Sequence, residues 1–227
     1  MSYLGHVLTH LRKDLRLEWR AREMINGMLF FALLVVVVFS LAFDPTSYPT
    51  MARQISGGLL WVGLLFASMT ALNQSWAREL HNQVLDAQRL TPAPASAFFL
   101  GKALANLIFV SIIELVLAPV FAIFYNLHPV GQAWLLLVIL PLGTWALTVN
   151  GTFFAALSLR TRNRELLLPL VLCPIAMPAL LAMIQATTNV LTGELDPGLW
   201  IKLLIGYDVL FTIACIFLFE TVLHVAD

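Results

Sequence analysis

Charged residues are scarce in this chain of 227 residues. Asp, Glu, Lys and Arg together make up 11% of it, whereas hydrophobic residues make up 60%. A water-soluble domain carries roughly 25% charged residues. A soluble fold could not bury this much apolar surface, so the composition excludes a soluble globular protein and predicts that lipid covers much of the molecule.

The sequence also lacks the motifs of an enzyme. A phosphate-binding loop needs an upstream Gly and a following Ser or Thr, and Gly101-Lys102 has neither. We find no Ser/His pair, Asp/Asp pair or HExxH motif, and no Cys/His cluster with metal-site spacing. The two cysteines, Cys173 and Cys215, lie in apolar stretches, which indicates no disulfide scaffold. We therefore expect neither catalysis nor a directly bound cofactor or metal.

Six long apolar stretches take up most of the chain. Each reaches the length of about 20 residues that a helix needs to cross a bilayer. We expect the spans at 24–43, 55–73, 97–125, 132–159, 166–188 and 199–223. The fold class that follows is all-α: a single transmembrane domain over residues 1–227, with six membrane-spanning helices within 24–223.

The basic residues are distributed unequally between the connecting segments. Of the thirteen Lys and Arg residues, Arg53 and Lys202 fall on one predicted side and the other eleven on the opposite side. Because basic loops stay in the cytoplasm, this pattern predicts a multi-pass protein with cytoplasmic N- and C-termini. The basic groups are spread along membrane-flanking loops, so we do not expect nucleic acid as a partner.

Residues 1–23 have the pattern of a helix that lies on the membrane surface. One predicted face is apolar and the other basic, which is typical of an interfacial amphipathic helix with membrane lipid as its partner. The apolar face would consist of Leu4, Val7, Leu8, Leu11 and Leu15, and the basic face of Arg12, Lys13, Arg16 and Arg20. The alternative is an ordinary cytosolic leader with accidental periodicity.

The segment 74–91 is the longest connection on the basic side. Its apolar residues recur at helical spacing and its charged residues lie between them, which predicts a short amphipathic helix. Such a helix could dock a motor protein, with the apolar stripe in a groove and the charges fixing the register. The alternative is a solvated connecting helix on the lipid headgroups. The candidate docking residues are Trp76, Arg78, Glu79, Leu80, Asp86 and Arg89.

Two features inside the spans are further candidates for function. Glu114 lies well inside the third span, where a charged group is costly and therefore often functional; the alternative is a structural, hydrogen-bonded carboxyl. The fifth span contains Pro169, Pro174 and Pro178, which predicts a bent or broken helix. Such a helix could line a pathway or act as a hinge, or it could be a static kink.

Several runs together resemble the CcmB family, the membrane subunit of the ABC transporter in bacterial cytochrome c maturation. They are Leu-Trp at 60–61, Trp-Ala-Arg-Glu-Leu at 76–80, Leu-Asp at 85–86, Leu-Thr-Pro-Ala-Pro at 90–94, Gly-Lys at 101–102 and the proline-spaced stretch 166–178. The chain departs from the family pattern at Gln83, where a Gly is common, and at Asp86, where a Glu is common.

The resemblance implies a function and a set of partners. The expected location is the bacterial inner membrane, in a complex with a CcmA-like ATPase, two copies of each, and CcmC-like and CcmD-like membrane proteins. ATP hydrolysis in the partner would drive haem delivery or the release of the haem-loaded periplasmic chaperone CcmE, with haem as possible cargo. The alternatives are an exporter of another hydrophobic cargo and an assembly factor without a motor.

Overall fold

The computed structural model describes residues 3–43, 45, 47–81, 93–127, 132–158 and 164–224, and no strand occurs within these ranges. Six of the helices are long and apolar enough to cross a membrane, which confirms the predicted all-α, six-span fold. The elements are α1 (Tyr3–Ala21), α2 (Glu23–Phe43), α3 (Pro49–His81), α5 (Ala95–Phe124), the 3-10 turn η1 (Ala133–Leu135), α6 (Leu136–Ser158), α7 (Arg164–Thr192) and α8 (Gly198–His224).

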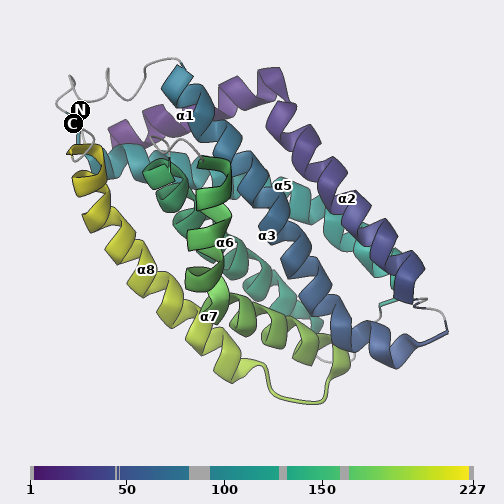
Figure 1. Ribbon diagram of the computed structural model, residues 1–227. Helices are drawn as coiled ribbons and strands as arrows, with labels where there is room; N and C mark the ends of the chain where they lie inside the picture. The colour runs from purple at the N-terminus through teal and green to yellow at the C-terminus, as the bar shows by residue number, and fades with distance from the viewer. Residues whose placement is uncertain are drawn as a thin grey trace.

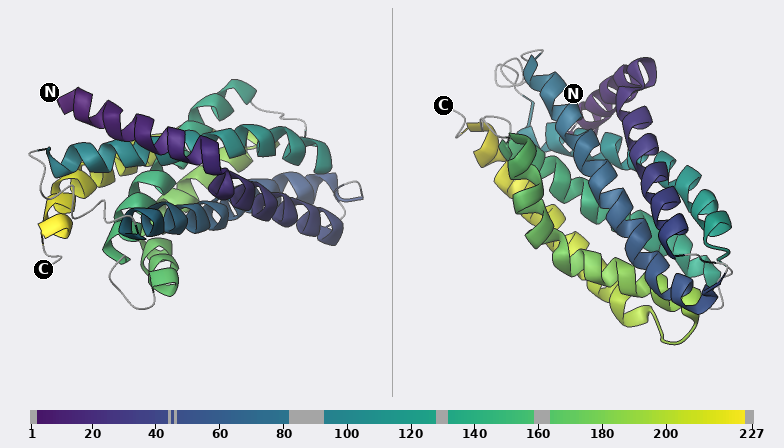
Figure 2. Two further views of the ribbon diagram at one scale, coloured as in Figure 1. Left: turned by 90° about the horizontal axis from the view of Figure 1, so that it is seen from above. Right: turned by 45° about the vertical axis from the view of Figure 1, so that its right-hand side comes forward.

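The six long helices form a bundle, and α1 lies at one end of it beside α5 (Figure 1). The last turns of α8 lie at the same end, which we call the α1 end. Figure 2 shows α1 running alongside the first half of α5 from two further directions. The predicted surface helix is therefore partly a packed element. Val7 is buried and Leu15 packs on the core, whereas Leu4 and Leu8 of the predicted apolar face are exposed.

A sharp corner joins α1 to α2. Arg22 adopts a left-handed backbone conformation with φ 56, and its N–H donates to the carbonyl of Glu18 at 2.7 Å. This conformation commonly ends helices, although Gly is the usual residue there. The Glu18 carboxylate then accepts hydrogen bonds from the N–H groups of Met24 and Ile25, at 2.8 and 3.2 Å. A side-chain acceptor at the first turn of α2 satisfies donors that the helix itself leaves unpaired.

Helix α3 runs through the middle of the bundle and packs against α2, α5, α6 and α7. Trp61 is fully buried on it and donates from Nε1 to Oγ1 of Thr187 on α7 at 2.9 Å. Gly143 of α6 faces this indole so closely that an added Cβ would lie 2.3 Å from Cη2. The absence of a side chain at Gly143 therefore permits α6 to pack against the largest side chain in the centre of α3.

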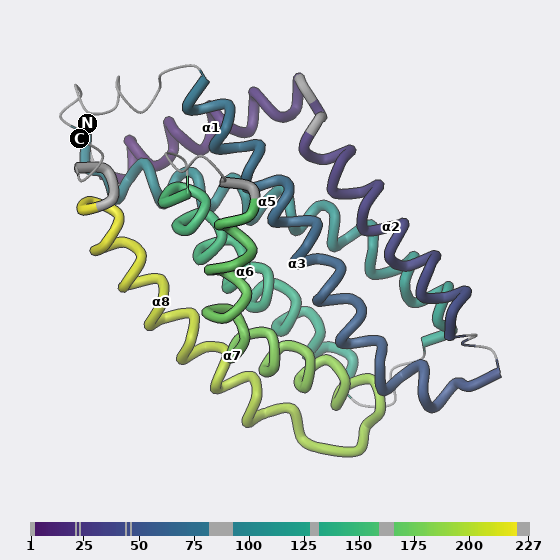
Figure 3. Tube along the Cα trace, viewed as in Figure 1, coloured from purple at the N-terminus to yellow at the C-terminus, as the bar shows by residue number. Residues whose placement is uncertain are grey.

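Helix α7 is continuous from Arg164 to Thr192 although it contains three prolines. Figure 3 shows that its axis changes direction along its length, so the helix is bent and not broken. One polar contact supports the bent stretch: the hydroxyl of Tyr207 on α8 donates to the carbonyl oxygen of Ile175 at 3.0 Å. The carbonyl that lacks its helical donor because of Pro178 is that of Pro174, so the Tyr207 contact lies one residue further along the same turn.

Candidate functional site: a charge network at the α1 end

The segment with the predicted docking residues begins as the end of α3. The second span does not finish at residue 73, because α3 continues to His81. Trp76 and Glu79 are buried, with exposed fractions of 0% and 4%, whereas Leu80 is 39% exposed. The predicted coupling helix over 74–91 is therefore, up to residue 81, an extension of the span. Asp86 and Arg89 lie outside the described residues.

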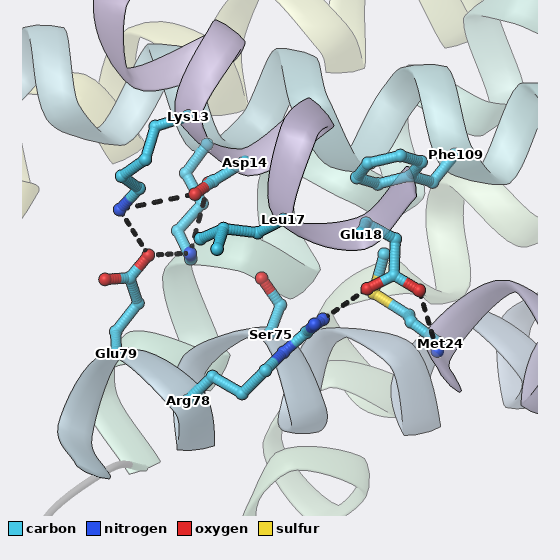
Figure 4. A pocket seen from close by; sticks show the side chains of 10 residues that line it. Lys13, Asp14, Leu17, Glu18, Met24, Ser75, Arg78, Glu79 and Phe109 are labelled. Carbon is cyan, nitrogen blue, oxygen red and sulfur yellow. Dashed lines mark hydrogen bonds and ion pairs between the residues drawn. The ribbon is translucent and has the colours of Figure 1, made fainter. Parts of the chain in front are cut away.

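Glu79 is the centre of an ion-pair network that joins three helices. Its Oε1 lies 2.7 Å from Nζ of Lys13 on α1 and 2.8 Å from Nζ of Lys102 on α5. Asp14 of α1 completes the network, with oxygens 3.3 Å from Lys13 Nζ and 3.2 Å from Lys102 Nζ. Two carboxylates thus face two ammonium groups, and the cluster is balanced in charge (Figure 4).

Burial makes this balance necessary. Lys102 has an exposed fraction of 1%, although its sequence position suggested a basic residue near the membrane surface. A buried charge without a partner is strongly unfavourable. Removal of one partner from a buried ion pair therefore destabilises a protein by about 3–5 kcal/mol. Lys102 also lies 5.0 Å from the centre of the Trp76 ring, so its ammonium group has an aromatic face beside it as well as two carboxylates.

The charge state of Lys13 follows from the same contacts. Burial lowers its pKa, but the carboxylates of Asp14 and Glu79 act in the opposite direction and outweigh it, so the pKa of Lys13 is raised above its ordinary value. Lys13 therefore remains a cation at physiological pH. The link between α1 and α3 through Lys13 therefore keeps its charge at physiological pH.

A second ion pair lies beside the first. Arg78 of α3 donates from Nη2 to Oε2 of Glu18, whose other oxygen accepts the α2 hydrogen bonds. Figure 4 shows the Glu79 network and the Arg78–Glu18 pair on either side of Ser75 and Leu17. Between them is a small cavity of about 210 Å³, whose lining includes Ser75, Met24 and Phe109. The end of α3 is thus held to α1 and α5 through Glu79 and to the α1–α2 corner through Arg78.

Gly101 provides the close approach that the network needs. A Cβ at this position would lie 2.7 Å from Cβ of His10 and 2.9 Å from the carbonyl oxygen of Val7. Only a residue without a side chain therefore allows α1 to lie this near to α5. The Gly-Lys pair of the sequence thus has two structural reasons: Gly101 admits α1, and Lys102 binds its acidic side.

The intramembrane candidates lie away from this network and from each other. Glu114 is buried on α5 and accepts a hydrogen bond from Oγ1 of Thr144 on α6 at 2.8 Å. Its other oxygen has no partner in the described part of the chain. Pro174 and Pro178 lie on α7, which packs against α3, α6 and α8. The structure therefore places Glu114 at the α5–α6 interface, whereas Pro174 and Pro178 are exposed on α7.

Sequence reasoning did not assign roles to Asp14, Glu18 or Lys102. A signal was present, because Asp14 and Glu18 are the two acidic residues of α1, four positions apart and hence on one helix face. Acidic residues in an otherwise basic helix indicate a face turned towards other cations. Among the described residues, no group of three or more His, Cys, Asp or Glu side chains could hold a metal ion.

Comparison with known proteins adds a family to this geometry. The chain matches the family model described as CcmB protein over residues 6–226. It is 35% identical to Heme exporter protein B of Rhodobacter capsulatus over 171 residues, 75% of this chain and 77% of that protein. It is 31% identical to Heme exporter protein B of Pseudomonas aeruginosa over 194 residues, 84% and 85% of the two chains. The protein of that name from Paracoccus denitrificans is 32% identical over 187 residues, 82% and 84%.

Proposed function

This chain belongs to the CcmB family, and on that premise we propose that it is the membrane subunit of an ABC transporter for cytochrome c maturation. It couples ATP hydrolysis in a partner ATPase to haem delivery or to release of the haem-loaded periplasmic chaperone. The family match over nearly the whole chain carries this proposal, and the relatives named Heme exporter protein B support haem as the cargo of the complex.

The complex would contain a CcmA-like ATPase, two copies of this chain, and CcmC-like and CcmD-like membrane proteins, and would act on CcmE. The absence of a phosphate-binding loop in the sequence supports a separate ATPase subunit. We place the protein in the bacterial inner membrane with the α1 end in the cytoplasm. The exposed arginines of α1 support this orientation because basic residues stay on the cytoplasmic side.

We propose that the ATPase docks at the end of α3 and on the segment that follows it. Leu80 is the partly exposed apolar residue there and would contact the partner directly. Trp76, Arg78 and Glu79 would act from inside, because their contacts fasten α3 to α1 and α5. Asp86 and Arg89, beyond the end of α3, would fix the register. A displacement of this end by the motor would then reach three helices at once.

The bend of α7 and the carboxyl of Glu114 are the proposed intramembrane elements. Pro174 and Pro178 would let the two parts of α7 move relative to each other, since a helix with missing backbone bonds bends at lower cost.

Glu114→Gln tests the carboxyl, because the amide oxygen can still accept the hydrogen bond of Thr144. We expect normal protein levels with reduced c-type cytochromes, and full maturation in this variant would reject a role for the acid.

The deciding experiment is purification of the protein from its native membrane in mild detergent, with stoichiometric partners identified by mass spectrometry. We expect an ABC ATPase together with CcmC-like and CcmD-like proteins. An ATPase without these proteins, and normal c-type cytochromes in a deletion strain, would favour another hydrophobic cargo. Recovery of CcmC-like and CcmD-like proteins without any ATPase would favour the assembly factor.

One substitution tests the docking site in the same preparation. Leu80→Asp places a charge in the proposed contact without touching the ion-pair network, so the ATPase should be lost from an otherwise intact membrane complex. Leu195→Asp is the matched control, because Leu195 is exposed in the connection between α7 and α8. Equal ATPase recovery with both variants would place the docking surface elsewhere.

A further inference from the structure

The charges of α1 are sorted onto two sides. Its acidic residues, Asp14 and Glu18, are buried against the bundle and paired with cations there. The arginines Arg12, Arg16 and Arg20 are exposed, and none of them forms an ion pair with another described residue. The outer side of α1 therefore carries positive charge that the part of the chain described by the structure does not neutralise.

Two of these arginines stand beside an apolar groove between α1 and α5. The groove has a volume of about 620 Å³ and its walls are almost wholly apolar. Arg16 and Arg20 are four residues apart, so they project from one face of the helix. Trp19 lies between them in sequence and is 65% exposed. The guanidinium group of Arg22 lies 6.0 Å from the centre of its ring. The groove is lined by Leu15, Arg16, Trp19, Arg20, Ile108, Phe109 and Ile112.

On α5 the groove is lined by Ile108, Phe109 and Ile112, which lie in the apolar part of that helix beyond Lys102. Lys102, with its ion pairs, marks the polar level. At a rise of 1.5 Å per residue, Ile108 and Ile112 lie about 9 and about 15 Å further along the helix. A ligand that fits this groove has an anionic group for the two arginines and a long apolar portion that continues along α5. A free phosphate ion meets the first requirement but not the second.

We propose that this groove binds an anionic phospholipid of the surrounding membrane. Its phosphate would lie between the guanidinium groups of Arg16 and Arg20, which can donate paired hydrogen bonds to phosphate oxygens. One acyl chain would follow Ile108 and Ile112, and Trp19 would lie at the headgroup level that tryptophan favours. The bound lipid would offset part of the positive charge on the outer face of α1. This inference is independent of the transported cargo and of the ATPase docking site.

Quenching of Trp19 fluorescence tests the proposal. The full-length protein is reconstituted in vesicles that contain phosphatidylcholine and phosphatidylglycerol, with bromine on the acyl chains of one lipid or the other. Because the chain has 6 tryptophans, the Trp19 signal is obtained by subtraction of the Trp19→Phe variant. We expect much stronger quenching by brominated phosphatidylglycerol than by brominated phosphatidylcholine at equal mole fraction.

The arginine variants identify the groove as the source of this selectivity. Each basic residue at an anionic surface strengthens binding about fivefold, so loss of both in Arg16→Gln/Arg20→Gln should weaken the preference by about thirtyfold. Arg12→Gln, which removes an exposed arginine outside the groove, should retain it, and Arg16→Lys/Arg20→Lys should retain part of it. Retention in the lysine variant would show that the two positions tolerate substitution and that the preference depends on their charge.

Three results would overturn the proposal. Equal quenching by the two lipids would mean that the groove does not select a headgroup. An undiminished preference in Arg16→Gln/Arg20→Gln would place the lipid elsewhere on the protein. Absence of quenching by both lipids in membranes that contain the complete complex would mean that a protein partner, and not lipid, covers the groove.

Discussion

Lys102 of α5 donates to Glu79 of α3 at 2.8 Å from a position that is almost fully buried. The pair joins the end of one span to the beginning of the next, and α1 supplies the second cation and the second carboxylate. A membrane helix needs no such network to insert, because its hydrophobicity is sufficient. The network instead fixes how α1, α3 and α5 lie relative to one another. Three predictions follow from it and from the contacts around it, and a fourth follows from the bend of α7.

Lys102→Met should destabilise the protein by about 3–5 kcal/mol, because it leaves buried carboxylates with one cation fewer. The measurement is the unfolding free energy in detergent. Lys202→Met is the matched control, since Lys202 is exposed on α8. The double variant Lys102→Met/Glu79→Met should cost less than the sum of the single changes, because no unpaired partner remains at Glu79. Additive effects of the two changes would contradict the pairing.

Gly101→Ala should push α1 away from α5 and cost about 1–3 kcal/mol, the usual penalty for an added methylene in a packed region. Its Cβ would collide with the backbone of α1, which cannot move as a flexible side chain can. Gly27→Ala on α2 is the control, because nothing lies within 4 Å of its added Cβ. Thermal unfolding of both variants tests the prediction. A melting temperature of Gly101→Ala equal to that of the native protein would show that α1 does not need this close approach.

His10 should make stability depend on pH. Burial and then the charge of Lys13 lower the pKa of His10 below 6.5, and its ring packs edge-on against Phe98 at 5.0 Å. Between the two pKa values the unfolded chain binds more protons, so stability rises with pH there. The contribution of His10 is complete above pH 6.5 and is lost as the pH falls through the folded-state pKa.

The measurement for this prediction is the unfolding free energy of the native protein and His10→Gln from pH about 7 to about 5, the range in which histidine titrates. The native protein should lose more stability than His10→Gln over this range. A native slope in His10→Gln would assign the pH dependence to other groups.

Tyr207→Phe should cost about 1 kcal/mol, since it removes the hydrogen bond to the carbonyl of Ile175 in the bent part of α7. In a Pro178→Ala background residue 178 regains an N–H that can donate to the carbonyl of Pro174. A straighter turn would weaken the neighbouring contact of Tyr207, so the same change should cost less by about 0.5 kcal/mol or more. The double-mutant cycle measures this difference as unfolding free energy. Equal costs in the two backgrounds would mean that the Tyr207 contact does not depend on the bend at Pro178.

The predictable part of the fold is that which depends on local hydrophobicity. Each of the six spans is an uninterrupted apolar run, and a bilayer selects such runs one by one, so their existence followed from the chain alone. The ends were less predictable. The polar residues after residue 73 predict that the second span ends there, yet α3 continues to His81, because Arg78 and Glu79 find partners on α1 and α5.

The sequence by itself determined the number of spans, the family and the position of every charge along the chain. It could not show which charges meet, because Asp14, Glu79 and Lys102 are far apart in sequence and each alone resembles a solvated group near a membrane surface. Only tertiary packing brings them within hydrogen-bonding distance, and it does so because Gly101 lets α1 reach α5. Hydrophobicity is a property of single segments, whereas ion pairing depends on the relative position of several, and that position was decided by the fold.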